Sequence, residues 1–181
     1  MCDELFADTR LYDYLLEIDR DLAARARAAG CPRCGDRLDS ATYPRKPRGG
    51  IARLLGREHS RRLSFCCARC HKRVTPPSVR FLGRRVYFGA VVVLACLRDL
   101  TAKRVNELKA LFGVDRRTLR RWRRWWREQF VRSPWWCVEK ARFSPSVDHR
   151  RLPGSLLERF GGAQPLVALL KFLSPLTTCP A

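Results

Sequence analysis

Two Cys-x-x-Cys pairs constrain the fold of this chain more than any other feature of its sequence. The pairs are Cys31-Pro-Arg-Cys34 and Cys67-Ala-Arg-Cys70, and 32 residues separate them. Four thiolates presented by two short hooks suit a tetrahedral structural Zn²⁺, in which the two sulfurs of one hook lie about 4 Å apart. The sequence therefore predicts one structural zinc ion, held in a zinc ribbon whose β-hairpin separates the hooks. The predicted ligands are Cys31, Cys34, Cys67 and Cys70.

The residues around each hook bear on this assignment. Pro32 fixes φ within the first hook, and Gly35 permits a positive φ directly after it. The second hook ends in His71, so its turn matches the pattern less well. A tight hook needs two residues between its ligands, which favours Cys67 over the neighbouring Cys66. Three residues stay open as replacement ligands: Cys66, His59 and His71.

The charge of the chain is strongly positive, because 37 Lys and Arg face 17 Asp and Glu, for a net charge of +20. Acidic residues outnumber basic ones in residues 1–30, so the excess lies in residues 31–181, and most of it is Arg. A field of this size attracts polyanions, and Arg makes bidentate contacts with phosphate and guanine. The composition therefore predicts a nucleic-acid partner.

The sequence also bears on the compartment. The acidic N-terminus lacks the positive region of a secretory leader, and the longest apolar run, from Phe88 to Leu97, is too short to span a bilayer. Nine cysteines, an odd number, fit a reducing compartment better than a disulfide framework. We expect a cytoplasmic, nucleoid-associated protein without a membrane partner.

Residue periodicity predicts a mainly α-helical chain with a small β zinc ribbon, in four parts. Residues 1–30 form an amphipathic helix that Asp8 or Thr9 caps and Gly30 ends. Residues 31–83 form the zinc ribbon, residues 84–132 a three-helix helix-turn-helix unit that binds DNA, and residues 133–181 a short helical tail. The stripe of the first helix comprises Leu11, Tyr14, Leu15, Ile18 and Leu22.

Acidic residues of this first helix lie between its apolar positions. They either form a solvated face or pack against the basic remainder of the chain or a partner helix.

In the ribbon, Leu38 to Tyr43 and Arg61 to Cys66 are the predicted strands, and Val79 to Leu82 is a candidate for a further one. The loop from Pro44 to Gly50 is either merely solvated or contacts phosphates through Arg45, Lys46 and Arg48.

From Tyr87 onward the periodicity is helical, and Tyr87 to Leu100 reads as a buried helix. The segment from Arg104 to Trp122 has the layout of a helix-turn-helix, with Gly113 in the turn and Asp115 as the cap of the second helix. The inward stripe of that second helix comprises Leu119, Trp122, Trp126 and Phe130.

The second helix carries seven Arg. Like charges at such spacing repel each other unless an anion is near, so this helix is the predicted DNA reader. We expect Arg120 or Arg121 to contact a base. The outward face comprises Arg117, Arg120, Arg121 and Arg124, and the flanks comprise Arg116, Arg123 and Arg127.

Three tryptophans lie off the inward stripe: Trp125, Trp135 and Trp136. They are either core residues or a stacking surface for single-stranded nucleic acid. Toward the C-terminus, Leu152 to Phe160 and Ala163 to Leu173 are the predicted helices. The leucines of the second helix need burial, either within the chain or in a homodimer.

The two hooks, followed by Phe112-Gly-Val-Asp-Arg-Arg-Thr-Leu-Arg-Arg-Trp122, resemble the N-terminal DNA-binding region of insertion-sequence transposases. The resemblance covers roughly residues 31–130 and implies recognition of an element's terminal repeats. Those transposases continue into a catalytic domain with three carboxylates and two Mg²⁺ ions. Beyond residue 130 this chain offers only Glu139, Asp148 and Glu158, so the resemblance implies DNA recognition without strand transfer.

These patterns together predict a sequence-specific, transposon-associated protein that binds double-stranded DNA and is not an enzyme. A separate transposase or recombinase is a further candidate partner. A protein that binds RNA or single-stranded DNA remains the main alternative. A small metal-dependent nuclease or a thiol redox protein fits less well, since four Cys ligands close the zinc shell and the His residues are scattered.

Overall fold

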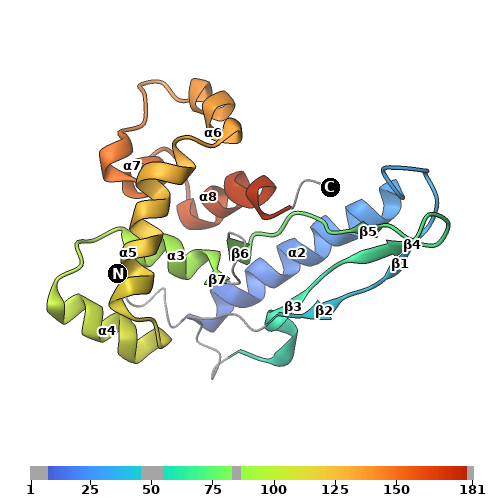
Figure 1. The fold of residues 1–181 in the computed structure, drawn as a ribbon, viewed down its shortest axis with the longest axis horizontal. Helices are drawn as coiled ribbons and strands as arrows, with labels where there is room; N and C mark the ends of the chain where they lie inside the picture. The colour runs from blue at the N-terminus through green and yellow to red at the C-terminus, as the bar shows by residue number, and fades with distance from the viewer. Residues whose placement is uncertain (1–7, 46–54, 83–86, 179–181) are drawn as a thin grey trace.

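The computed structural model describes residues 8–45, 55–82 and 87–178. This part of the chain is mainly helical and contains three small antiparallel sheets. The long helix α2 and the hairpin strands lie together at one side of the molecule, and most of the other helices lie at the opposite side (Figure 1). Within the described ranges, no helix combines the length and apolar character needed to cross a bilayer.

Helix α2 spans Thr9–Ala29. The Asp8 carboxylate accepts a hydrogen bond from the backbone N–H of Arg10 at 3.0 Å and caps the first turn, while Gly30, at a φ of 75°, ends the helix. Both ends agree with the sequence prediction, but the buried face is rotated from the predicted stripe. Tyr14 is 42% exposed, and the buried residues are Tyr12, Leu15, Leu16, Asp19 and Ala23.

A long antiparallel hairpin follows α2. Leu38 lies opposite Cys67 and Tyr43 opposite Arg62, and the register is continuous between these pairs. A short 3-10 helix, Arg57–Ser60, precedes the returning strands. These strands agree with the two predicted ones. They are β1 (Leu38–Ser40) and β2 (Tyr43–Pro44), paired with β4 (Phe65–Cys67) and β3 (Arg61–Arg62), and β5 (Arg73–Val74) adds to β4.

The chain then enters the larger core. Strands β6 (Phe81–Leu82) and β7 (Tyr87–Phe88) pair with each other, and α3 (Gly89–Cys96) follows with all eight residues buried. The predicted buried helix therefore begins at Gly89 rather than at Tyr87. A Cβ at Gly89 would lie only 2.9 Å from Cδ2 of Leu170, so glycine allows the close approach of the last helix.

Two helices joined by a short turn form the next segment. Helix α4 (Ala102–Phe112) ends at Gly113, which has the left-handed φ of 63° that favours glycine. The Asp115 carboxylate accepts a hydrogen bond from the Thr118 N–H at 2.6 Å and caps α5 (Arg116–Arg124). From Trp125 to Phe130 the helix continues with π-type geometry, as element η2.

The C-terminal region packs into the same core, although its sequence suggested a tail. Its helix α8 (Pro165–Leu173) contacts α3, and the leucines of its apolar face are buried within the chain. Burial of this face therefore requires no second copy. The other elements are α6 (Pro134–Glu139), η3 (Lys140–Arg142), η4 (His149–Arg151), α7 (Gly154–Leu157) and η5 (Ser174–Thr177).

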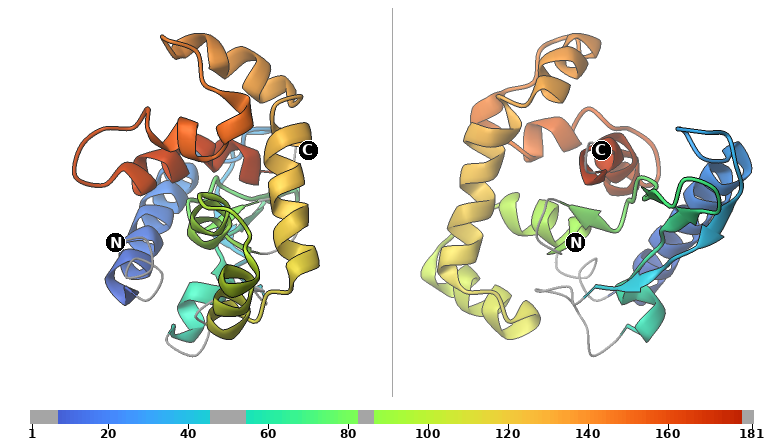
Figure 2. Two further views of the ribbon diagram at one scale, coloured as in Figure 1. Left: turned by 90° about the vertical axis from the view of Figure 1, so that its left-hand side faces the viewer. Right: turned by 45° about the vertical axis from the view of Figure 1, so that its right-hand side comes forward.

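The described residues form two hydrophobic clusters. The larger one joins the N-terminal half of α2 to the elements from β6 to η5. The smaller one lies around the hooks and includes Ala23 and Ala26 of α2 with Leu38 and Phe65 of the hairpin. Helix α2 thus contributes to both clusters and holds the hairpin against the helical region (Figure 2).

Candidate metal centre and arginine-rich helix

The two cysteine hooks have the same backbone structure. In the first, the Gly35 N–H donates to the Cys31 carbonyl at 2.8 Å, and the Cys31 N–H donates to the Asp36 carbonyl at 2.9 Å. In the second, the His71 N–H donates to the Cys67 carbonyl at 3.1 Å, and the Cys67 N–H donates to the Lys72 carbonyl at 3.0 Å. The chain therefore builds one type of turn twice and places the two turns face to face.

The position after each hook requires a positive φ. Gly35 has a φ of 74° and His71 a φ of 54°. Glycine adopts this region without steric cost, whereas a residue with a Cβ does so only at a cost in energy. The second hook therefore forms the same turn despite its histidine.

The four sulfurs of the hooks form one compact cluster. Their Sγ atoms all lie within 4.8 Å of one another; Cys31 Sγ is 3.6 Å from Cys70 Sγ, and Cys34 Sγ is 3.4 Å from Cys67 Sγ. In a tetrahedral Zn–thiolate site with bonds of about 2.3 Å, neighbouring sulfurs lie roughly 3.8 Å apart. The cluster is therefore compatible with a single metal ion held by the four cysteines that the spacing predicted.

The alternative ligands lie elsewhere. Cys66 and Cys67 are consecutive on β4, and consecutive side chains of a strand point to opposite faces. The Cys66 thiol lies 3.5 Å from the His71 carbonyl oxygen, as a donor to it, and His59 Nε2 lies 2.9 Å from an Asp13 carboxylate oxygen. Among the described residues, the metal-capable cluster contains neither of these histidines nor Cys66.

The protonation of the cluster depends on hydrogen bonds within it. The Cys70 backbone N–H, 3.4 Å from the Cys67 sulfur, stabilises that thiolate and lowers the pKa of Cys67 to about 7. The Asp36 backbone N–H favours the Cys34 thiolate, but the hydrogen bond with Cys67 and the loss of solvent prevail and raise the pKa of Cys34 to about 12. Four thiolates this close repel one another, so a cation is required for all four to ionise.

A buried ion pair joins the hairpin to α2. Arg80 Nε donates to Asp19 Oδ2 at 2.7 Å, and both side chains are 1% exposed. Its Nη1 donates to the backbone carbonyls of Glu58 and His59 in the 3-10 helix, and its Nη2 donates to the carbonyl of Arg61 in β3. The Asp19 carboxylate also accepts from the Val79 N–H at 2.7 Å. One Arg and one Asp thus tie together three segments of the chain.

Sequence reasoning missed this pair, although two signals pointed to it. Arg80 stands within the apolar run from Val79 to Leu82, where a charge requires a partner. Asp19 lies four residues after Leu15 and four before Ala23, so it shares the buried face of α2. The sequence left two alternatives for the acidic residues of this helix. For Asp19, packing against the basic remainder of the chain is the one that the structure has.

The arginines of α5 and η2 fall into three groups by their contacts. Arg121 Nη2 donates to the Tyr87 hydroxyl, and Arg123 Nη2 donates to an Asp99 carboxylate oxygen at 3.1 Å. Arg124 makes a surface ion pair with Glu128, at 3.8 Å. The other four arginines are exposed, and within the described ranges no ion pair or hydrogen bond engages their side chains: Arg116, Arg117, Arg120 and Arg127.

The inner face of the same helix is buried as predicted. The exposed fractions of Leu119, Trp122, Trp126 and Phe130 are at most 4%. The Tyr87 ring packs edge-on against Trp122, with 4.9 Å between the ring centroids. This packing fixes the helix so that its arginine face points away from the core.

The predicted phosphate-contacting loop is only partly described. Arg45 is half-buried, and its Nη2 donates to the Tyr43 hydroxyl at 3.2 Å. This contact holds the guanidinium against the hairpin. Arg45 is therefore less free to contact a phosphate than a side chain in an open loop would be. Lys46 and Arg48 lie outside the described residues.

Comparisons of the chain with protein-family models, with curated proteins and with solved structures find no match.

Proposed function

We propose that this chain is a sequence-specific protein that binds double-stranded DNA in a mobile element. In this proposal α4 and α5 act as a helix-turn-helix, and the hairpin with its four cysteines acts as a zinc ribbon. The observation that carries the proposal is the outer face of α5, where Arg116, Arg117 and Arg120 are exposed and form no ion pair within 4.0 Å among the described residues, although the Asp115 carboxylate lies near enough to Arg117 to interact with its charge. Unpaired arginines in a row attract a polyanion.

The arrangement around α5 supports this assignment. Gly113 turns the chain between the helices, Asp115 caps α5, and Leu119 and Trp122 anchor its inner face. Helices α3 and α4 both contact α5 from behind. Figure 2 shows α5 and its continuation as one long helix along an edge of the molecule. A helix presented in this manner can enter a major groove.

The contacts also separate the arginines by proposed role. Arg121 and Arg123 are bound to Tyr87 and Asp99, so part of their hydrogen-bonding capacity is used inside the protein. Arg120 lacks such a contact within the described ranges, and we assign it the base-reading role that the sequence left open between Arg120 and Arg121. The remaining exposed arginines are assigned to phosphates.

Zn²⁺ is the proposed metal. A set of four thiolates suits zinc, and a shell closed by four protein ligands leaves no position for a substrate. The ion would be structural, and the cysteines would hold the two hooks and the small cluster around them together. A separate transposase or recombinase and a second copy of the chain remain proposed partners.

The alternative functions find less support. Trp136 is fully buried and presents no free face for a base, and the partly buried Trp135 packs on Phe172 with 4.7 Å between the ring centroids. For a nuclease, Asp148 caps η4 and Glu158 pairs with Arg151, and neither joins the cysteine cluster. Trp125 and Trp135 are both partly exposed, and Trp125 lines a cleft.

DNA selected from a random pool by the purified protein, followed by titrations at several salt concentrations, tests the proposal. The test variant replaces Arg116, Arg117, Arg120 and Arg124 with Ala, and the control removes the same charge from α2, at Arg10, Arg20, Arg25 and Arg27. We expect the test variant to lose preference for the selected site, at about 1–3 kcal/mol for each base contact, and to lower the salt slope by about 0.9 for each phosphate contact. A folded test variant that binds its selected site no worse than the control would overturn the proposal.

A further inference from the structure

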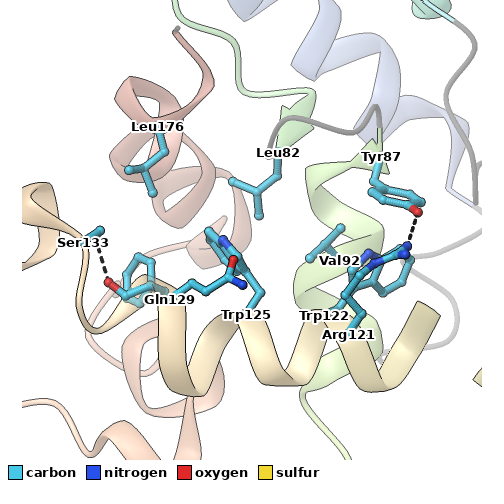
Figure 3. A pocket seen from close by; sticks show the side chains of 10 residues that line it. Leu82, Tyr87, Val92, Arg121, Trp122, Trp125, Gln129, Ser133 and Leu176 are labelled. Atoms are coloured by element: carbon cyan, nitrogen blue, oxygen red, sulfur yellow. Dashed lines mark hydrogen bonds between the residues drawn. The ribbon is translucent and has the colours of Figure 1, made fainter. Parts of the chain in front are cut away.

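A cleft of about 400 Å³ opens beside the arginine-rich helix. Figure 3 shows Trp125 and Gln129 on the helix side and Leu82 and Leu176 on the opposite side, with Tyr87 and Arg121 at one end. The residues 83–86 that join β6 to β7 lie outside the described residues, and the site is defined without them. The cleft has the size and the mostly apolar lining of small-molecule sites.

The lining has a specific chemistry. The rings of Tyr87, Trp122 and Trp125 supply flat apolar surfaces, and Leu82 and Leu176 face them. Among the described residues of the lining, Arg121 is the one charged side chain and none is acidic. Its Nη2 contacts Tyr87 and Thr118, whereas Nε and Nη1 have no hydrogen-bond partner among the described residues. A carboxylate can accept two parallel N–H bonds from such a guanidinium.

The helix is irregular where it borders the cleft. The π-type segment from Trp125 to Phe130 supplies Trp125, Gln129 and Phe130 to the lining. A π-type turn costs hydrogen-bond geometry, and such turns occur frequently at functional sites. Here the irregularity places Trp125 partly exposed at the cleft while Trp126 remains fully buried.

We propose that this cleft binds a planar aromatic carboxylate of one or two rings, whose ring lies between Trp125 and the two leucines and whose carboxylate pairs with Arg121. The bound anion neutralises an arginine on the border of the outer face of α5.

Calorimetric titration of the full zinc-loaded chain with 2-naphthoate tests the site, with the neutral isostere 2-naphthamide as the comparison. We expect a dissociation constant of about 1 mM or below for 2-naphthoate, from the affinity that a ligand of this size attains. The charge-assisted contact should make 2-naphthoate bind about tenfold more tightly than 2-naphthamide. The titration contains no DNA, so its outcome is independent of the proposed function.

Two variants and a matched control locate the binding. Arg121→Gln should remove the advantage of 2-naphthoate over 2-naphthamide, and Leu176→Trp should abolish binding of both by filling the cleft. Arg120→Gln removes the same charge one residue away, outside the lining, and should change neither affinity. Equal loss in the two Arg variants, unchanged binding in Leu176→Trp, or no binding at roughly ten times the expected dissociation constant would each overturn the proposal.

Discussion

At the residue scale, the cysteine cluster depends on which face of β4 each side chain occupies. Cys67 faces the other three ligands, while the adjacent Cys66 points to the opposite face. Adjacent cysteines in one strand therefore provide a matched pair of substitutions. We expect Cys67→Ser to lose the bound metal and Cys66→Ser to retain one ion per chain. Elemental analysis of the purified variants measures this, and equal metal loss in both would show that the ligand set is wrong.

His71 allows a second residue-scale prediction. Its φ of 54° is the conformation that Gly35 adopts after the first hook. Replacing His71 with Gly should stabilise the metal-loaded protein by about 1 kcal/mol, because glycine adopts this region without a Cβ clash. Urea unfolding of the zinc-loaded variant measures the change. A loss of stability would mean that the imidazole makes a contact worth more than the strain.

The residue scale also shows what sequence can predict. The ligand set was predictable because each hook is local, and four consecutive residues contain the information for two ligands. The position of the Arg45 side chain was not predictable from sequence, because it depends on a hydrogen bond to Tyr43 and on backbone pairing with Ser60 across the hairpin. The roles of Arg121 and Arg123 likewise depend on Tyr87 and Asp99, which lie more than twenty residues earlier in the chain.

At the scale of elements, α2 is the connection between the two hydrophobic clusters, and the buried pair of Asp19 with Arg80 fixes its position. Removing one member of a buried pair leaves the other charge without compensation, at a cost of about 3–5 kcal/mol. We expect Asp19→Asn and Arg80→Met each to destabilise the protein by this amount.

The double variant tests whether the pair acts as a unit. It should be more stable than the sum of the two single losses predicts, since it leaves no unpaired buried charge. A double-mutant cycle from urea unfolding measures the coupling. Additive losses would mean that the backbone contacts of Arg80, rather than its pairing with Asp19, hold α2 against the hairpin.

Elements were predictable where their signals were local. The Asp8 cap, the Gly30 end and the turn at Gly113 follow from residue types at helix ends, and the structure has all three. The buried face of α2 differs from the predicted stripe because Asp19 belongs to it, and the partner that allows its burial, Arg80, lies 61 residues away in the sequence. The π-type segment had no sequence signal, since Trp125 and Trp126 read as part of a regular helix.

At the scale of the whole molecule, the two clusters differ in what holds them. The larger cluster consists of apolar side chains from most of the described chain, and all five tryptophans belong to it or pack against it. The smaller one contains Cys31, Leu38, Phe65 and Cys67 with little else that is buried. We expect so small an apolar cluster to depend on a metal ion held by the four cysteines for part of its stability.

This difference predicts a stepwise response to metal removal. A strong chelator should unfold the hairpin while the larger cluster stays folded, because no cysteine ligand lies within that cluster. Hydrogen exchange should therefore rise in residues 31–45 and 57–74, whereas tryptophan emission should stay unchanged, since no tryptophan lies in the smaller cluster. Added Zn²⁺ should restore the slow exchange. If the emission instead shifts at the same chelator concentration as the exchange, the buried Asp19–Arg80 pair couples the two clusters into one cooperative unit, and the stepwise prediction is wrong.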